Sequence, residues 1–215
     1  GALRSRVEPY DGTELPEGVY LLTAAADVQK DRVELGVKGW GKGEESWLIA
    51  YEVFYGDTQT LYAVHEGNLW YRVEKYLEKS FEHEYGIKLR ISACAIDAGY
   101  ATKSVQNFTK RMQRRGKSWI FPIQGDKGME GAPLLNRGSV RSKVRIKQFI
   151  VGTATAKNII FSRLHITEYG PGYMHFPKFC DEEYFLQLTA EKQKQVYEKG
   201  VPVRKRWEKI RTRNE

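Results

Sequence analysis

The sequence predicts an α/β protein built on one mixed sheet, in which an antiparallel meander of three strands precedes parallel strands with flanking helices. Two observations lead to this fold class. Three runs with strand-like patterns, residues 19–28, 32–41 and 45–56, follow one another with only short turns between them, and such turns join antiparallel neighbours. Residues 89–125 then read as strand, helix and strand, which implies a right-handed crossover between parallel strands.

Further helices are expected at three places. From residue 60 to about residue 84, apolar residues return at spacings of three to five, as in an amphipathic helix. Residues 154–164 and 181–200 are also expected to be helical. Residues 1–18 are polar, contain two prolines and show no periodicity, so we interpret them as a linker that precedes one folded domain over residues 19–215.

Composition narrows the class of protein. With 215 residues, of which 41% are hydrophobic and 13% aromatic, the chain can bury a core and is not disordered. A net charge of +8 favours a polyanionic partner, although basic charge also serves solubility alone. The two cysteines match neither a zinc site nor a disulfide framework, which favours a reducing compartment, and no apolar run approaches the roughly 20 residues of a membrane span. We therefore expect an intracellular protein that is not associated with a membrane.

Two acids stand where strands end. Asp27 follows the apolar run of the first strand, and Asp97 ends the strand that begins near residue 89. If these two strands are neighbours, the carboxylates meet at one edge of the sheet, where they repel each other unless a proton or a cation lies between them. Oxygen ligands of this kind suit Mg²⁺ or Mn²⁺, and a pair of such ions commonly hydrolyses phosphodiesters.

Each acid also has a simpler interpretation. Asp97 could cap the helix that follows it, and Asp27 could merely begin a turn. Asp181, with two glutamates directly after it, could complement the dipole of a helix start. Both strand-end acids together are harder to explain by such local roles, so chemistry is the better interpretation of the pair.

Several stretches resemble the nuclease domain of the large terminase subunit of lambda-like tailed bacteriophages, a family with a ribonuclease H-like fold. The stretches are residues 25–47, 95–100, 184–193 and 211–215. The first is the most specific, because it combines a Gly-Trp-Gly turn with a pair of glutamates after it. The resemblance covers nearly the whole chain after residue 18.

This resemblance implies a metal-dependent endonuclease that cuts concatemeric double-stranded DNA during genome packaging in the host cell cytoplasm. It implies two Mg²⁺ or Mn²⁺ ions as cofactors. The implied partners, besides DNA, are an ATPase domain of the same full-length chain ahead of the linker, the small terminase subunit and the portal of the procapsid. No Walker A pattern occurs in these 215 residues, so we expect no motor within them.

The resemblance also implies site residues. Asp27 and Asp97 would be catalytic metal ligands, and the third acid of such sites usually comes from a C-terminal helix. Glu215, in the terminal Asn-Glu pair, is the candidate, although the apolar run and the aspartate that follow this pair in the family are missing, so we expect a C-terminally truncated domain. Asp181 is the second choice for the third ligand.

Basic residues on the helix expected after Asp97, and in and just after a glycine-rich loop at residues 126–139, are candidates for contacts with DNA phosphates. Members of the family often carry a lysine where this chain has Gln124, and Lys127 could supply that charge to the transition state. For each of these residues, a solvated surface charge is the simpler interpretation. The candidate DNA-binding residues are Lys103, Lys127, Arg137, Arg141 and Lys143.

Two other functions remain open at this stage. A non-catalytic ribonuclease H-like module would bind nucleic acid through its basic face alone, without divalent metal. A resolvase-like or transposase-like nuclease of the same fold would prefer branched DNA or a 3′-hydroxyl nucleophile. The fold alone does not separate these functions, because one scaffold hosts many chemistries.

Overall fold

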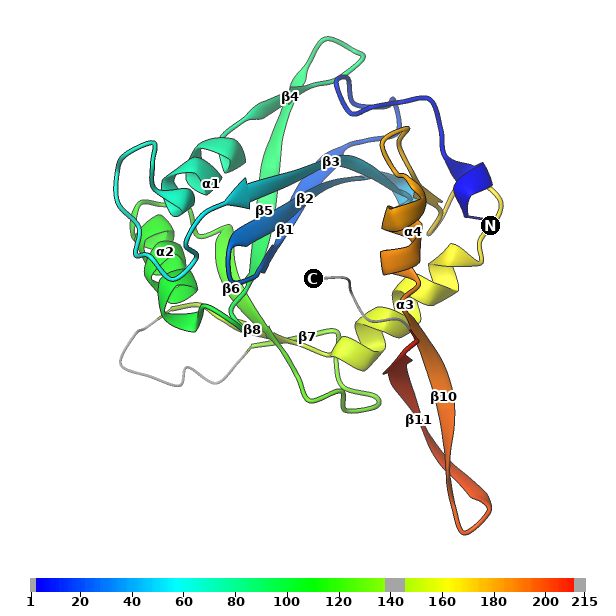
Figure 1. Ribbon diagram of the computed structural model, residues 1–215. Coiled ribbons are helices and arrows are strands. Elements are labelled where there is room, and N and C mark those ends of the chain that lie inside the picture. Colours follow the sequence, from blue (N-terminus) through cyan, green and yellow to red (C-terminus); the bar gives the residue numbers. More distant parts are fainter. Residues whose placement is uncertain (1–2, 138–145, 211–215) are drawn as a thin grey trace.

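Nine strands form one large mixed sheet at the centre of the computed structural model, which describes residues 3–137 and 146–210 (Figure 1). Their spatial order is β7-β8-β6-β5-β1-β2-β3-β9, and the short β4 pairs separately with β5. The strands are β1 (Leu21–Val28), β2 (Arg32–Trp40), β3 (Ser46–Tyr55), β4 (Ser80–Glu82), β5 (Lys88–Asp97), β6 (Ile120–Gly125), β7 (Leu135–Arg137), β8 (Phe149–Val151) and β9 (Met174–His175).

Four α-helices accompany the sheet in the described residues. They are α1 (Leu69–Leu77), α2 (Thr102–Arg114), α3 (Thr153–Leu164) and α4 (Glu182–Leu188). The predicted meander is confirmed, because β2 pairs antiparallel with both β1 and β3. The predicted parallel part is also confirmed: β5 runs parallel to β1 and to β6, and α2 is the crossover between β5 and β6.

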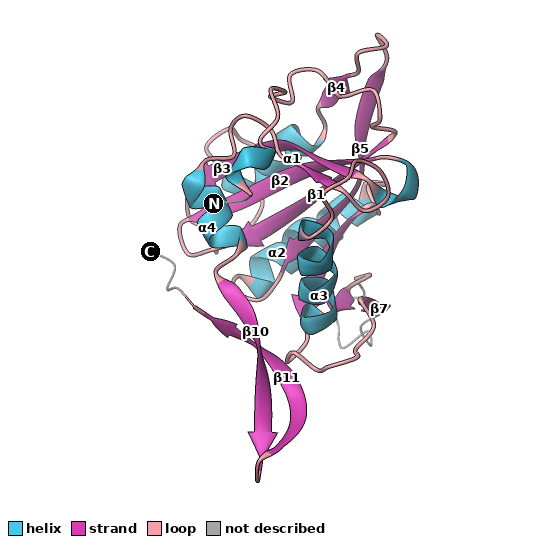
Figure 2. Ribbon diagram, turned by 90° about the vertical axis from the view of Figure 1, so that its right-hand side faces the viewer, coloured by secondary structure: helices cyan, strands magenta, loops and turns pink. Residues whose placement is uncertain are grey.

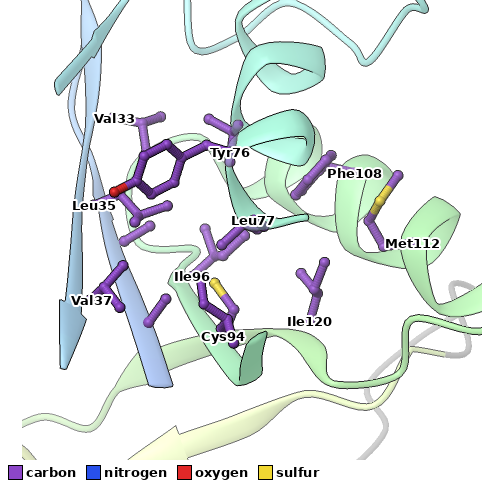
Figure 3. Packing of buried hydrophobic residues seen from close by; sticks show 14 of the residues in the cluster. Val33, Leu35, Val37, Tyr76, Leu77, Cys94, Ile96, Phe108, Met112 and Ile120 are labelled. Atoms are coloured by element: carbon purple, nitrogen blue, oxygen red, sulfur yellow. The ribbon is translucent and has the colours of Figure 1, made fainter. Parts of the chain in front are cut away.

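The main core lies between one face of the sheet and helices α1 and α2 (Figure 3). Every second residue of β2, namely Val33, Leu35 and Val37, is fully buried, and β5 contributes Cys94 and Ile96 to the same layer. Because successive side chains of a strand point to opposite faces, the intervening residues of β1, β2 and β5 lie on the other face of the sheet. That second face carries the candidate site.

The helix expected from residue 60 to about residue 84 is wrong in its extent. Only Leu69–Leu77 is helical, and Asn68 caps its start by accepting a hydrogen bond from the Tyr71 N–H at 3.1 Å. Residues Ser80–Glu82 instead form β4, paired with β5. The Asn68 cap sets the start of α1, and pairing with β5 makes the end of the expected helix a strand. The spacing of apolar residues reports neither of these contacts.

The helix expected over residues 181–200 is also wrong in its extent. It stops at Leu188, and the chain continues as an antiparallel hairpin of β10 (Glu191–Glu198) and β11 (Val201–Lys209). The hairpin turns at Lys199 and Gly200, whose φ angles of 51° and 80° are those of a two-residue turn with left-handed backbone. The Lys-Gly pair was the local signal for this turn.

The segment interpreted as a linker lies against the domain in its described part. Leu15 is fully buried, and its backbone forms a bridge with His83. Arg6 donates hydrogen bonds to the carbonyl oxygens of Leu164 at 2.9 Å and Met174 at 3.0 Å. The interpretation as a linker to another domain stays a prediction, and the structure adds that residues 3–18 have fixed contacts with the fold.

Both cysteines are buried free thiols, in agreement with the expectation that they form no disulfide. Burial raises the pKa of the Cys94 thiol to about 12, so it is an unreactive core residue. Within residues 3–137 and 146–210, none of the helices has the length and apolar character that crossing a membrane requires.

Candidate active site

Asp27 and Asp97 lie side by side on the open face of the sheet. β1 and β5 are parallel, with Ala26 opposite Ile96, and the two acids are the next residues along these strands. Both side chains are half-buried rather than part of the core, since they alternate with the buried residues of their strands. They line a common cleft of about 640 Å³. The expected proximity is therefore present, while their role as metal ligands stays a prediction.

Asp97 does not cap the helix that follows it. The residue at the N-cap of α2 is Ala101, and no side chain caps that helix. Asp97 Oδ1 instead accepts a hydrogen bond from the Gly99 N–H at 2.9 Å. A β-carbon at residue 99 would come within 3.3 Å of the same oxygen, so glycine lets the backbone approach the carboxylate closely. The structure thus excludes the capping role and fixes the orientation of Asp97.

Asp27 belongs to a network that the sequence alone did not reveal. Its neighbour on β2 is Glu34, and the side-chain amide of Gln29 contacts both acids, at 3.1 Å from Asp27 Oδ2 and 3.3 Å from Glu34 Oε1. Arg32 Nε donates to Glu34 at 2.9 Å, and the Tyr51 hydroxyl donates to its other oxygen. The Gln29 amide thus bridges the two carboxylates and helps to fix their positions.

Glu34 is the functional candidate that sequence reasoning missed. The signal was the register of the β1–β2 hairpin, which turns between Gln29 and Arg32. Counting outward from that turn places Val28 opposite Val33 and Asp27 opposite Glu34. A residue directly across an antiparallel pair shares a face with its partner, so Glu34 had to lie beside Asp27.

Helix α4 and the residues before it form the opposite wall of the cleft. Asp181 caps α4 by accepting a hydrogen bond from the Tyr184 N–H at 2.8 Å, which is the local role that its position suggested. It nevertheless faces the same cleft as Asp27 and Asp97, as does Glu183. The described lining therefore includes five acids and neither lysine nor arginine, a charge distribution that attracts cations. The acids are Asp27, Glu34, Asp97, Asp181 and Glu183.

The donor set fits part of a site for a divalent metal ion. Two carboxylates on adjacent strands supply oxygen ligands of the kind that Mg²⁺ and Mn²⁺ prefer, and Mg²⁺ usually keeps several waters. Within the described parts of the chain, however, no three His, Cys, Asp or Glu side chains are grouped closely enough to hold an ion. A complete site needs a further ligand, and the predicted one, Glu215, lies outside the described residues.

The described candidate DNA-binding residues lie outside the lining of this cleft. Lys103 is exposed at the start of α2, and Lys127 is exposed in the loop after β6, the strand that pairs with β5 next to Asp97. Arg137 ends β7. Arg141 and Lys143 lie outside the described residues.

The loop that carries Lys127 is anchored at its start. Asp126 accepts hydrogen bonds from the Thr153 N–H at 3.0 Å, from the Thr153 hydroxyl at 2.8 Å and from the Gly128 N–H at 3.0 Å. The bond from the Thr153 N–H is the main reason why the pKa of Asp126 is lowered. Lys127 is therefore presented next to a fixed turn, although no described contact assigns it a partner.

Lys38 offers a test of electrostatics on this face of the sheet. It lies on β2, half-buried and on the same face as Glu34, and burial lowers the pKa of its amine to about 8, with a smaller effect from Arg163. In the unfolded chain this pKa is 10.5, so the positive charge on Lys38 at pH 7 destabilises the folded state relative to the unfolded one. We expect Lys38→Met to raise the free energy of unfolding by about 2 kcal/mol at pH 7.

This gain should shrink as pH rises from 8 and vanish above 10.5, where the unfolded chain also loses the proton. Urea unfolding at a series of pH values measures it, with Lys30→Met, at an exposed position, as the control. A gain that stays constant up to pH 11 would mean that the substitution acts through packing instead of charge.

A mixed sheet that starts with a meander and carries acids on its first strand and on the parallel neighbour is the architecture of a ribonuclease H-like α/β protein. The comparisons with known proteins then define the family. The protein-family model for the endonuclease domain of the terminase large subunit gpA matches residues 1–215, so the chain belongs to this family.

Two terminase large subunits show the same relationship. That of Escherichia phage lambda is 34% identical over 225 aligned residues, which cover 99% of this chain and 33% of the relative. That of Enterobacteria phage P21 is 27% identical over 209, covering 94% of this chain and 31% of the relative. The chain thus spans about a third of the length of these relatives. No solved structure matches it.

Proposed function

We propose that this chain is a metal-dependent endonuclease that hydrolyses phosphodiesters of double-stranded DNA, with water as the nucleophile and Mg²⁺ or Mn²⁺ as the cofactor. The observation that carries the proposal is the placement of Asp27 and Asp97 on adjacent parallel strands, in a cleft lined by five acids. Membership of a terminase endonuclease family supports the reaction class. The metal and the number of ions, two, are inferred from the carboxylate chemistry.

In this mechanism Asp27 and Asp97 would hold the metal, together with Glu215 or Asp181. A metal bound there would supply Lewis acidity for the activation of water and for the developing charge on the leaving oxygen. The remaining residues position these ligands. Gln29 holds Asp27 from one side, and the Gly99 N–H fixes one oxygen of Asp97. Such fixed ligands do not need to reorganise during the reaction.

Specificity and partners follow from the same chemistry. A metal site reads phosphates and not bases, so sequence selection has to come from elsewhere. We infer that the small terminase subunit, the ATPase domain of the full-length chain and the portal of the procapsid direct cleavage during packaging of concatemeric DNA in the host cell cytoplasm. The size of the relatives, which are about three times as long as this chain, supports a partner domain.

Cleavage of supercoiled plasmid tests the proposal. The wild-type chain should cut in Mn²⁺ or Mg²⁺ and not in EDTA, and Asp97→Asn should abolish cutting. Asp181→Asn is the matched comparison, because asparagine caps a helix as well as aspartate does but is a poorer metal ligand. We expect this variant to retain most activity if Asp181 only caps α4.

Each other outcome is informative. A loss in Asp181→Asn equal to that in Asp97→Asn would make Asp181 the third ligand. Binding of DNA without cleavage in any metal would contradict the proposal and support a non-catalytic module. A strong preference for four-way junctions over the plasmid would instead indicate a resolvase-like enzyme.

A further inference from the structure

The β10–β11 hairpin forms its own two-stranded sheet and projects away from the body of the molecule (Figure 2). Nearly all of its outer two thirds is exposed, including every residue from Val201 to Arg206. A two-stranded ribbon without a third strand or a covering helix has little stability of its own. Its length beyond the body therefore calls for a function.

The hairpin is strongly basic. Seven basic residues stand against three acids, Glu191, Glu198 and Glu208. Lys194 lies directly opposite Arg206, and this pair of like charges is only partly neutralised by Glu208, which contacts both. Like charges across a strand pair are unfavourable unless an anion is near. The basic residues are Lys192, Lys194, Lys199, Arg204, Lys205, Arg206 and Lys209.

The base of the hairpin is fixed to helix α3. Asn158 Oδ1 accepts hydrogen bonds from Trp207 Nε1 at 3.1 Å and from Gln193 Nε2 at 3.2 Å, and the rings of Trp207 and Phe161 lie 4.6 Å apart. An ion pair between Lys157 and Glu191, at 2.5 Å, adds to this attachment. The arm is thus held in one direction relative to the sheet, which lowers the entropy lost when a partner binds.

A groove of about 860 Å³ lies between the hairpin and α3, and a smaller one of about 200 Å³ shares several of its residues. The smaller groove reaches Lys127 in the loop after β6. Basic side chains from the hairpin, α3 and this loop line the two grooves. They are Lys127, Lys157, Lys192, Arg204, Lys205 and Arg206.

This basic surface adjoins the acidic cleft. Leu188, the last residue of α4, lines that cleft, and β10 begins three residues later at Glu191. A polyanion bound at the acidic cleft would therefore lie near the base of the arm. A two-stranded ribbon is also narrow enough to enter the major groove of B-form DNA, which is about 12 Å wide.

We propose that the β10–β11 hairpin is an arm that binds the phosphate backbone of duplex DNA beside the cleavage site. The proposal rests on the proposed function for the nature of the polyanion, and it assigns the binding to a surface that the candidate residues of the sequence did not include, apart from Lys127. The basic side chains give the arm affinity without sequence preference.

The test is the affinity of the chain for a 30-base-pair duplex, measured by fluorescence anisotropy in EDTA at several salt concentrations. The triple variant Arg204→Gln, Lys205→Gln, Arg206→Gln should bind at least about 10-fold more weakly. The slope of log affinity against log salt concentration should also be smaller in magnitude by about two to three units. The matched control is Lys79→Gln, Lys88→Gln, Arg90→Gln, exposed residues around the β4 edge, which should bind within about two-fold of the wild type.

Circular dichroism checks that each variant is folded. If the triple variant unfolds, Lys192→Gln with Lys194→Gln on β10 provides a second test, with an expected loss of about five-fold. Wild-type affinity in folded arm variants would overturn the proposal and leave the arm as a contact for protein. Because the assay contains no metal, this result is independent of whether the wild-type chain cleaves DNA, which the plasmid experiment measures separately.

Discussion

Asparagine in place of Asp27 is expected to lower the rate of DNA cleavage by at least about 10³-fold, while the fold and the affinity for duplex DNA stay unchanged. Asparagine keeps the shape of the side chain and its contact with Gln29. It removes the negative charge with which Asp27 is proposed to hold a metal ion. Metal ions contribute several kcal/mol of transition-state stabilisation, and each 1.4 kcal/mol is a factor of ten in rate. Single-turnover cleavage of a labelled duplex in Mn²⁺ measures the loss.

Asp31→Asn is the matched control for this substitution. Asp31 lies in the turn of the same hairpin, where its exposed carboxylate pairs with Arg32, and it does not line the cleft. The control should cleave at the wild-type rate. Calorimetric titration with Mn²⁺ provides a readout besides activity, since Asp27→Asn should bind the ion more weakly. Equal cleavage and equal metal binding in Asp27→Asn and the wild type would remove Asp27 from the site.

The largest expected loss of stability comes from Lys117→Met. Lys117 Nζ lies 2.6 Å from Glu74, a glutamate of α1 that is 1% exposed and also bonds the Tyr62 hydroxyl and Arg115. Burial alone would raise the pKa of Glu74, but the bonds and charges of its partners outweigh burial and lower it. Removing Lys117 leaves the buried carboxylate of Glu74 without its nearest cation. We therefore expect Lys117→Met to lower the free energy of unfolding by about 3 kcal/mol.

Urea unfolding at pH 7 measures this loss, and Lys75→Met is the control. Lys75 forms an exposed ion pair with Glu78, so its removal should change the free energy of unfolding by no more than the experimental error. The pH dependence has a definite sign. Since the folded pKa of Glu74 is lowered, its contribution is present above the unfolded pKa of 4.5 and is lost as pH falls through the folded value. The wild type should therefore lose more stability on acidification than Lys117→Met, and parallel curves would contradict the role of this pair.

The sequence by itself determined the centre of the fold and the two strand-end acids. The three-strand meander follows from alternating patterns and short turns, and the β5–α2–β6 crossover follows from the element order, since a parallel connection needs a helix between its strands. Asp27 and Asp97 could be paired at that stage, because neighbouring parallel strands end at the same edge of a sheet. The register of β1 and β5 agrees with that reasoning.

Only the tertiary structure decided which other residues share the site and where the later elements end. Glu34 enters the cleft through the register of an antiparallel pair, and Asp181 through the docking of α4 across the sheet, which no local pattern encodes. The hairpin after Leu188 is held at its base by Asn158 and Phe161 of α3. From the sequence alone, residues 181–200 had favoured one continuous helix. Local periodicity records only what a segment prefers alone, whereas these features depend on contacts between segments far apart in the chain.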